Sequence, residues 1–192
     1  MTGRATWQYD EFTYTGTDYG DPEEVAQYEA RMSELRDFDV EAGEIMAAIG
    51  LAPGHTLLEV GMGTGWFALR AAAHCRQVYA CDVSRAMVDH ARRRAAREGI
   101  GNIAIHHAGF LTYVHEGEPV DAVVSQLAMH HIPDFWKAIA LRRIAAALKP
   151  GGMFWFKDVV FGFDPGEYEQ AFDEALASFP PAFRAPWVGH VN

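Results

Sequence analysis

The chain has 192 residues, 49% hydrophobic and 22% charged, which is the ordinary composition of a soluble globular domain. Its formal net charge of −10 argues against tight nonspecific binding to nucleic acid, because an acidic chain has no general attraction to phosphate backbones. Residues 1–10 contain no apolar signal-peptide core, and no apolar run approaches the roughly 20 residues that cross a bilayer, so we expect a cytoplasmic protein with reduced cysteines.

The first residues form an aromatic arm without helical or strand periodicity, over residues 1–20. Asp21-Pro22-Glu23-Glu24 is typical of a helix start, and a further helix is predicted over residues 39–50, ending at Gly50. We predict three parts: an arm and helix over residues 1–38, a core over 39–164, and a helix and tail over 165–192. The arm is either a lid over the site or a segment packed on the flank of the sheet. The aromatic residues ahead of the core that suggest a lid are Tyr9, Tyr14, Tyr19 and Tyr28.

From residue 56 onward, predicted strands and helices alternate. The predicted strands are Thr56–Val60, Gln77–Asp82, Ile103–Ala108, Val120–Leu127 and Met153–Val160. The predicted helices are Trp66–Ala73, Ala86–Glu98, Asp134–Leu148 and Tyr168–Ser178. This alternation predicts a doubly wound α/β fold with parallel strands joined by right-handed crossovers, and the apolar strands indicate a sheet covered on both faces.

A turn with three glycines follows the first of these strands. Gly61, Gly63 and Gly65 have the spacing Gly-x-Gly-x-Gly, which differs from the Gly-x-Gly-x-x-Gly of dinucleotide enzymes. Glu59 precedes the turn, and Asp82 ends the next strand, where a carboxylate can accept both ribose hydroxyls. Two plainer interpretations remain open: Asp82 as a strand-end turn former and Glu59 as a helix-capping partner.

Four stretches of the chain resemble the class I S-adenosylmethionine (SAM)-dependent methyltransferases. They are Glu59–Gly65, Asp82 with Ser84 and Met87, Asp121–Gln126, and Leu148-Lys149-Pro150-Gly151-Gly152. The resemblance implies a Rossmann-like sheet with strand order 3-2-1-4-5 and SAM as cofactor. The residues that it places around SAM are Glu59, Gly61, Gly63, Gly65, Asp82, Val83, Gly109, Phe110, Ser125 and Gln126.

The chain departs from the family pattern at two places. Many relatives carry Gly-Asp after the third strand, where the Asp meets the adenine amino group, but here Ala108-Gly109-Phe110 lacks that carboxylate. Phe110 is therefore either an adenine contact or a core residue. After Asp164 we find a helix and a proline-containing tail, so the usual C-terminal hairpin of strands six and seven is predicted to be missing. The fifth strand would then be an exposed edge, open to a homo-oligomeric contact or to cover by the tail, unless the chain is truncated.

No single catalytic residue follows from the sequence, and the candidates, near the ends of the fourth and fifth strands, are His130, His131 and Asp158. A histidine there is either a general base or a turn residue.

The histidines lack metal-ligand spacing, so no metal is expected. The cysteines, Cys75 and Cys81, do not form a Cys-x-x-Cys pair, so no redox role is expected.

These features predict SAM-dependent methyl transfer to a small-molecule acceptor, with no DNA or membrane partner. The alternatives are an RNA or protein methyltransferase, a SAM-binding protein without turnover and, more distantly, a nicotinamide dehydrogenase. The nearest candidate for a basic patch is Arg92, Arg93, Arg94 and Arg97, which a solvated helix face explains better.

Overall fold

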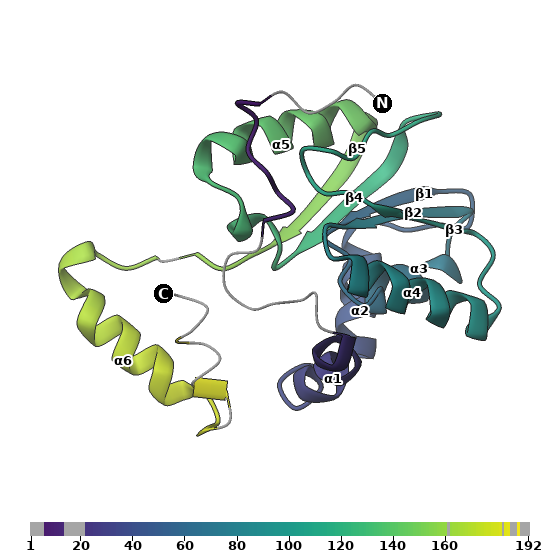
Figure 1. Cartoon of the computed structure of the whole chain (residues 1–192). Coiled ribbons are helices and arrows are strands. Elements are labelled where there is room, and N and C mark those ends of the chain that lie inside the picture. The colour runs from purple at the N-terminus through teal and green to yellow at the C-terminus, as the bar shows by residue number, and fades with distance from the viewer. Residues whose placement is uncertain (1–5, 14–21, 161, 182, 185–187, 189–192) are drawn as a thin grey trace. The chain divides into compact units, whose positions relative to one another are not determined.

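The structure is a computed structural model, and it describes residues 6–13, 22–160, 162–181, 183, 184 and 188. The chain divides into two units, one made of residues 1–13 and 19–158 and the other of residues 14–18 and 159–192. The sheet and the candidate site belong to the first unit (Figure 1). In the second unit, the short 3-10 helix η2 (Pro165–Glu167) precedes α6 (Tyr168–Ser178), whose bounds are those predicted.

Five parallel strands form the sheet in the order β3-β2-β1-β4-β5. The strands are β1 (Thr56–Val60), β2 (Gln77–Asp82), β3 (Ile103–His107), β4 (Val120–Gln126) and β5 (Leu148–Lys157). This confirms the predicted doubly wound α/β fold and its strand order. The order reverses between β1 and β4, which is where an open α/β sheet binds its ligands, beyond the carboxyl ends of the strands.

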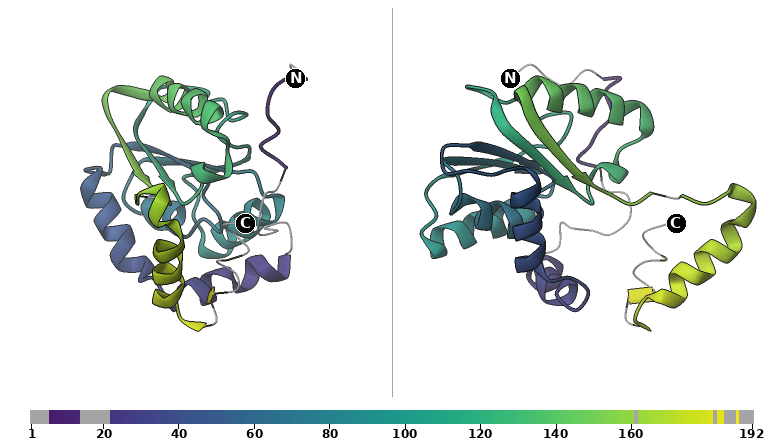
Figure 2. Two further views of the ribbon diagram at one scale, coloured as in Figure 1. Left: turned by 90° about the vertical axis from the view of Figure 1, so that its left-hand side faces the viewer. Right: turned by 180° about the vertical axis from the view of Figure 1, so that it is seen from behind.

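Helices cover both faces of the sheet, as the two additional views show (Figure 2). One face packs on α2 (Phe38–Ala48), α3 (Trp66–Ala72) and α4 (Arg85–Glu98), and the other packs on α5 (Asp134–Ala147). Successive side chains of β1 point to opposite faces of the sheet, so Leu57 packs in the cluster with α2, α3 and α4, and Leu58 packs in the cluster with α5. In the same unit, α1 (Pro22–Met32) packs against α4. No helix of the described residues is both long and apolar enough to cross a membrane.

The fifth strand begins and ends earlier than predicted. It covers Leu148–Lys157 instead of Met153–Val160, so the expected turn at residues 149–152 lies inside the strand, between Leu148, which pairs with Val120, and Met153, which pairs with Ala122. The preceding helix α5 stops at Ala147. An irregularity in the pairing between Val120 and Ala122 accommodates the extra residues. Gly152 is close to the backbone of this region, because an added Cβ would lie 3.0 Å from the carbonyl oxygen of Asp121. The early start of β5 is therefore due to a bulge, which hydrophobic periodicity does not reveal.

The outer edge of the sheet is formed by β5, whose Met153 and Phe156 are each nearly half exposed. Among the described residues the sheet has no sixth or seventh strand. The homo-oligomeric contact at this edge stays a prediction.

Candidate cofactor and active site

The glycine turn brings the end of β1 against β2. Gly61, Gly63 and Gly65 all have positive φ values, of 76°, 55° and 78°, which residues other than glycine rarely adopt. The backbone N–H groups of Gly61 and Met62 donate to the carbonyl oxygen of Cys81, at 2.9 and 3.1 Å. A Cβ on Gly61 would overlap that of Ala128, whereas one on Gly63 would meet nothing within 4 Å. The backbone of Gly63 is therefore open to close approach by a ligand.

The Asp82 carboxylate is hydrogen-bonded to this turn. Its Oδ2 accepts from the Gly63 N–H at 2.8 Å, and its Oδ1 accepts from the Ser84 N–H at 2.8 Å. Burial raises the pKa of Asp82, while the Ser84 and Gly63 amides act in the opposite direction. A carboxylate has about four lone-pair positions, so Asp82 can still accept hydroxyl groups. The structure thus brings Asp82 together with the predicted glycine turn.

Glu59 lies beneath the turn and is almost fully buried, with 1% of its surface exposed. Burial raises its pKa well above the usual value, although a backbone hydrogen bond from Ala68, in the first turn of α3, opposes this. That hydrogen bond is the helix-capping contact left open by the sequence. The Oε2 atom of Glu59 has no hydrogen-bond partner among the described residues. The carboxyl group can therefore still bond to a ligand or to water.

Two more buried polar atoms without a partner among the described residues lie at the end of β4. They are Ser125 Oγ and Gln126 Nε2. The Gln126 Oε1 accepts from Arg36 Nη2 at 3.3 Å, which turns the amide nitrogen away from that arginine. Arg36 is itself fixed by an ion pair with Glu41. Unpaired buried polar atoms are unfavourable unless a ligand or water satisfies them, so this set, together with the open glycine turn, fits a polar nucleoside cofactor.

The loop after β4 begins with strained backbone, because Leu127 has a φ of 49°. It then forms the short 3-10 helix η1 (Met129–His131). His130 contacts Asp158 twice: its backbone N–H donates to Oδ2 at 3.0 Å, and its Nδ1 lies 2.5 Å from Oδ1. The Asp158 side chain is only 4% exposed. The structure thus joins two of the three catalytic candidates in one pair, while His131 stacks its ring on His130 at 4.1 Å.

Residues 6–13 lie along the carboxyl edge of the sheet. The ring of Trp7 stacks on Trp136 of α5 with centroids 6.3 Å apart, and Phe12 contacts His107 at the end of β3 with centroids 5.0 Å apart. The arm therefore reaches from α5 to β3. Tyr14 and Tyr19, two of the tyrosines in the lid hypothesis, lie outside the described residues.

The segment after β3 lies at the same edge. Phe110 is buried in the cluster that packs on α5, which is the core position left open by the sequence. Gly109 contacts Val83, since an added Cβ would lie 2.5 Å from Val83 Cγ1. The carbonyl oxygen of Val83 also lies 2.8 Å from His107 Nε2, within hydrogen-bond distance. The backbone after β2 and the backbone after β3 are thus held together beside Asp82.

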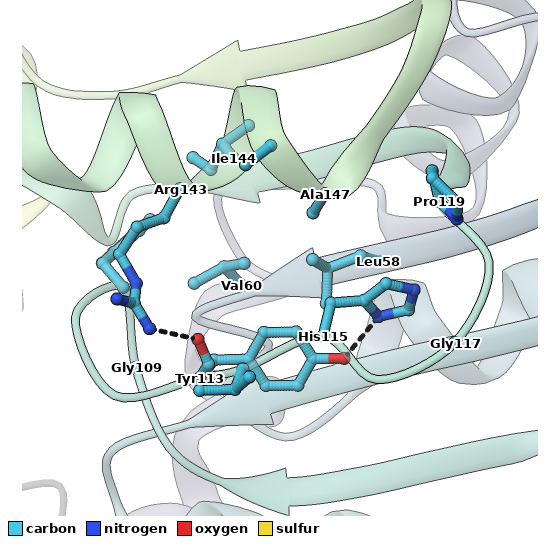
Figure 3. Close-up of a pocket in the computed structure, with 13 residues that line it drawn as sticks. Leu58, Val60, Gly109, Tyr113, His115, Gly117, Pro119, Arg143, Ile144 and Ala147 are labelled. Atoms are coloured by element: carbon cyan, nitrogen blue, oxygen red, sulfur yellow. Dashed lines mark hydrogen bonds between the residues drawn. The ribbon is translucent and has the colours of Figure 1, made fainter.

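A separate cavity of about 290 Å³ lies between β1, α5 and the segment before β4 (Figure 3). Its lining includes Leu58, Val60 and Ile144, and at one side Tyr113 Oη lies 3.1 Å from His115 Nδ1. Gly109 lines it, but Asp82 and the glycines of the turn do not. The cavity is therefore a neighbour of the candidate cofactor site and not its centre.

Sequence reasoning missed three charged residues that support the site: Glu11, Glu29 and Arg36. Glu29 accepts from Thr64 Oγ1 at 2.5 Å and from Arg94 Nη1 at 2.7 Å, so α1 is tied to the glycine turn. Arg36 contacts Gln126, and Glu11 contacts Leu111. The contacts with Thr64, Gln126 and Leu111 all join residues at least 35 positions apart in the sequence. No local pattern in the sequence signals such contacts.

Known proteins resemble the chain over the same region. Residues 57–152 match the family described as "Methyltransferase domain". An uncharacterized methyltransferase from Geobacillus kaustophilus is 34% identical over 141 residues, which cover 72% of this chain and 63% of the relative. The chain thus spans less than two thirds of that relative's length.

Two solved structures share the fold. The YcgJ protein from Bacillus subtilis has a TM-score of 0.60 and 24% identity, covering 71% of this chain and 56% of that one. The DhpI–SAM–HEP complex has a TM-score of 0.61 and 23% identity, covering 80% and 67%. With the family match, the strand order and the glycine turn in agreement, the chain belongs to the class I, Rossmann-like family of SAM-dependent methyltransferases.

Proposed function

We propose that the chain binds SAM and transfers its methyl group to a small-molecule acceptor. The observation that carries this proposal is the 2.8 Å hydrogen bond from the Gly63 N–H to Asp82 Oδ2. It puts the acid that would accept the ribose hydroxyls directly against the turn that would line the rest of the nucleoside. The solved DhpI complex, which contains SAM on a similar fold, supports the same cofactor.

SAM, when bound, would supply an electrophilic methyl group on a sulfonium centre. The residues that would hold it are Glu59, Gly61, Gly63, Gly65, Asp82, Val83, Gly109, Phe110, Ser125 and Gln126. Gln126 would donate from Nε2, since Arg36 occupies the amide oxygen. Methyl transfer needs alignment and exclusion of water more than it needs acid or base groups, so the buried floor of the site is its main contribution.

His130 would act as a general base toward the methyl acceptor. Asp158 lies at its Nδ1, an arrangement that favours the tautomer with the proton on Nδ1 and makes Nε2 the proton-accepting nitrogen. A base of this kind is useful when the attacking atom is a hydroxyl oxygen or an amine that must lose a proton. Asp158 is then a positioning residue.

A small-molecule acceptor agrees with the charges of the chain. The net charge is −10, and the basic residues of α4 are partly engaged within the protein. Arg94 pairs with Glu29 and Glu98, and Arg92 donates to the Ile105 carbonyl oxygen. Engagement of Arg92 and Arg94 reduces the basic surface that an RNA backbone, which needs several cationic contacts, could use.

Calorimetric titration with SAM and S-adenosylhomocysteine tests the binding step. We expect the wild-type chain to bind both ligands and Asp82→Ala to lose at least about tenfold in affinity, because a hydrogen-bonded charged acceptor is removed. Asp89→Ala is the matched control, since Asp89 lies on the surface of α4 and pairs with Arg92 at 3.8 Å. Equal affinity in wild type and Asp82→Ala would overturn the proposal.

Turnover is tested by following S-adenosylhomocysteine formation with a panel of phenols, alcohols and amines. Production with at least one compound of the panel supports catalysis. Tight binding of SAM without production, across the panel and after addition of RNA and protein, would instead favour a SAM-binding protein without turnover.

A further inference from the structure

Glu11 is a buried carboxylate that comes from the arm and not from the sheet. Only 7% of its surface is exposed. Both carboxylate oxygens accept from the Leu111 N–H, at 3.1 and 2.9 Å, and Oε1 also accepts from Thr112 Oγ1 at 2.6 Å. A carboxylate is costly to bury, so a segment with no secondary structure carries it there only if it is well compensated.

This carboxylate lies at the base end of the candidate nucleoside site. An added Cβ on Gly109 would lie 2.5 Å from Glu11 Oε2 and 2.5 Å from Val83 Cγ1, so all three residues meet at one point. Val83 directly follows Asp82, the acid expected at the ribose. A base attached to that ribose extends along the edge of the sheet from β2 toward β3, which is where Glu11 lies.

The hydrogen bonds of Glu11 leave one acceptor position on the oxygen nearest this point. Oε1 accepts two hydrogen bonds among the described residues, whereas Oε2 accepts one. Each carboxylate oxygen has two lone pairs. Phe110, in the segment after β3, supplies no side-chain acceptor, and its ring is buried in the core.

From these contacts we propose that Glu11 determines base specificity, by accepting a hydrogen bond from the exocyclic amino group of the cofactor's adenine. This inference rests on the proposed function. An ionised carboxylate is acceptor-only, so it attracts an amino group and repels a ring carbonyl at the same position. The arm would then be part of the cofactor site, and its contacts with Trp136 and His107 would hold Glu11 in place.

The test compares S-adenosylhomocysteine with its inosine counterpart, in which a carbonyl replaces the amino group, by calorimetric titration. We expect the wild-type chain to prefer the adenine ligand by at least about tenfold. Glu11→Gln keeps an oxygen that can accept from Leu111 but replaces the second acceptor with a donor. It should lose most of the preference, through weaker binding of the adenine ligand and not of the inosine ligand.

Asp10→Asn is the matched control, because it removes a neighbouring negative charge from the same arm and should leave the preference unchanged. Near-ultraviolet circular dichroism reports whether the stack of Trp7 on Trp136 survives in each variant. If Glu11→Gln weakens both ligands equally, Glu11 only docks the arm and the inference is wrong.

Two further results would contradict it. Unchanged selectivity in Glu11→Gln would show that the base is recognised elsewhere, and tighter adenine binding would show that the carboxylate competes with the base for the Leu111 N–H. A wild-type chain that binds neither ligand would overturn the proposed function itself, and this outcome is recognised before any variant is made.

Discussion

His130 Nδ1 lies 2.5 Å from Asp158 Oδ1, so a residue of the loop after β4 is paired with the residue that follows β5. The two strands end side by side, with Gln126 opposite Lys157. The histidine is thus oriented by a carboxylate that is almost completely buried, which is how a protein fixes both the direction and the tautomer of an imidazole.

We predict that His130→Gln lowers turnover of an accepted hydroxyl or amine substrate by about 10²-fold or more, because the proton acceptor is lost. Asp158→Asn should lower kcat by a smaller factor and change the histidine tautomer seen by nitrogen NMR. The affinity for SAM should change less than about twofold in both variants. His74→Gln is the matched control, because His74 is an exposed histidine outside the site. A parallel loss of SAM affinity would indicate a structural role for the pair.

Gly61→Ala should destabilise the protein more than Gly63→Ala. Both residues have positive φ, which costs about 1–2 kcal/mol for an alanine. Only at Gly61 does the added Cβ overlap Ala128, and such overpacking adds about 1–3 kcal/mol. Thermal unfolding measures the difference, and the double variant Gly61→Ala, Ala128→Gly should recover the overpacking part. Equal melting temperatures for the two single variants would contradict the close contact between the glycine turn and the loop after β4.

Asp121 predicts how stability changes in acid. Burial raises its pKa, but hydrogen bonds from Lys149 and Thr56 outweigh this and lower the pKa to about 2. Because the folded pKa is below the ordinary value, the stabilisation is present above about pH 4 and is lost as the pH falls toward 2. Asp121→Asn should therefore cost about 1–2 kcal/mol at pH 7, and this deficit should shrink in acid.

Urea unfolding of both proteins between pH 3 and pH 7 checks this. Asp134→Asn is the control, because Asp134 makes a similar lysine pair at 2.9 Å with a side chain that is 96% exposed. A deficit for Asp121→Asn that is constant over the whole range would show that the carboxylate is not preferentially ionised in the folded chain.

Glu59 predicts the opposite dependence on pH. Its folded pKa is raised by burial, so the folded protein keeps a proton that the unfolded chain loses above about pH 4.5. The wild type therefore loses stability as the pH rises from there toward the folded pKa, whereas Glu59→Gln has no proton to lose at this position. Urea unfolding from pH 4 to pH 8 should show the variant gaining on the wild type, and parallel curves would mean that the carboxyl group ionises normally.

Much of the fold could be predicted because its signals are local. The strand, glycine turn and helix around Gly61–Gly65 follow one another directly along the chain, and Asp82 ends a strand that its own apolar pattern defines. Local chemistry and position in the sheet suffice to bring these residues together. The predicted start of β5 was wrong because it depends on the irregular pairing of β5 with Val120 and Ala122 of β4, a property of two strands and not of one.

The other parts of the site depend on contacts over long sequence separations. Glu11 lies 100 positions from Leu111, in an arm that has no periodicity from which its direction could be inferred. His130 and Asp158 were named separately, but their pairing follows from the register of β4 and β5. Sequence patterns specify faces and turns, whereas register and the path of an irregular segment are set by packing of the whole chain.

The hydrogen bond between Glu29 and Thr64 makes α1 a reporter of events at the turn. Thr64 is fully buried between two glycines, and Glu29 also holds Arg94 of α4. A ligand that stiffens the turn should therefore slow amide hydrogen exchange in α1, a helix that supplies none of the proposed ligand contacts. Occupancy could then be followed in cell extracts by deuterium uptake of a single peptide, before any acceptor is identified.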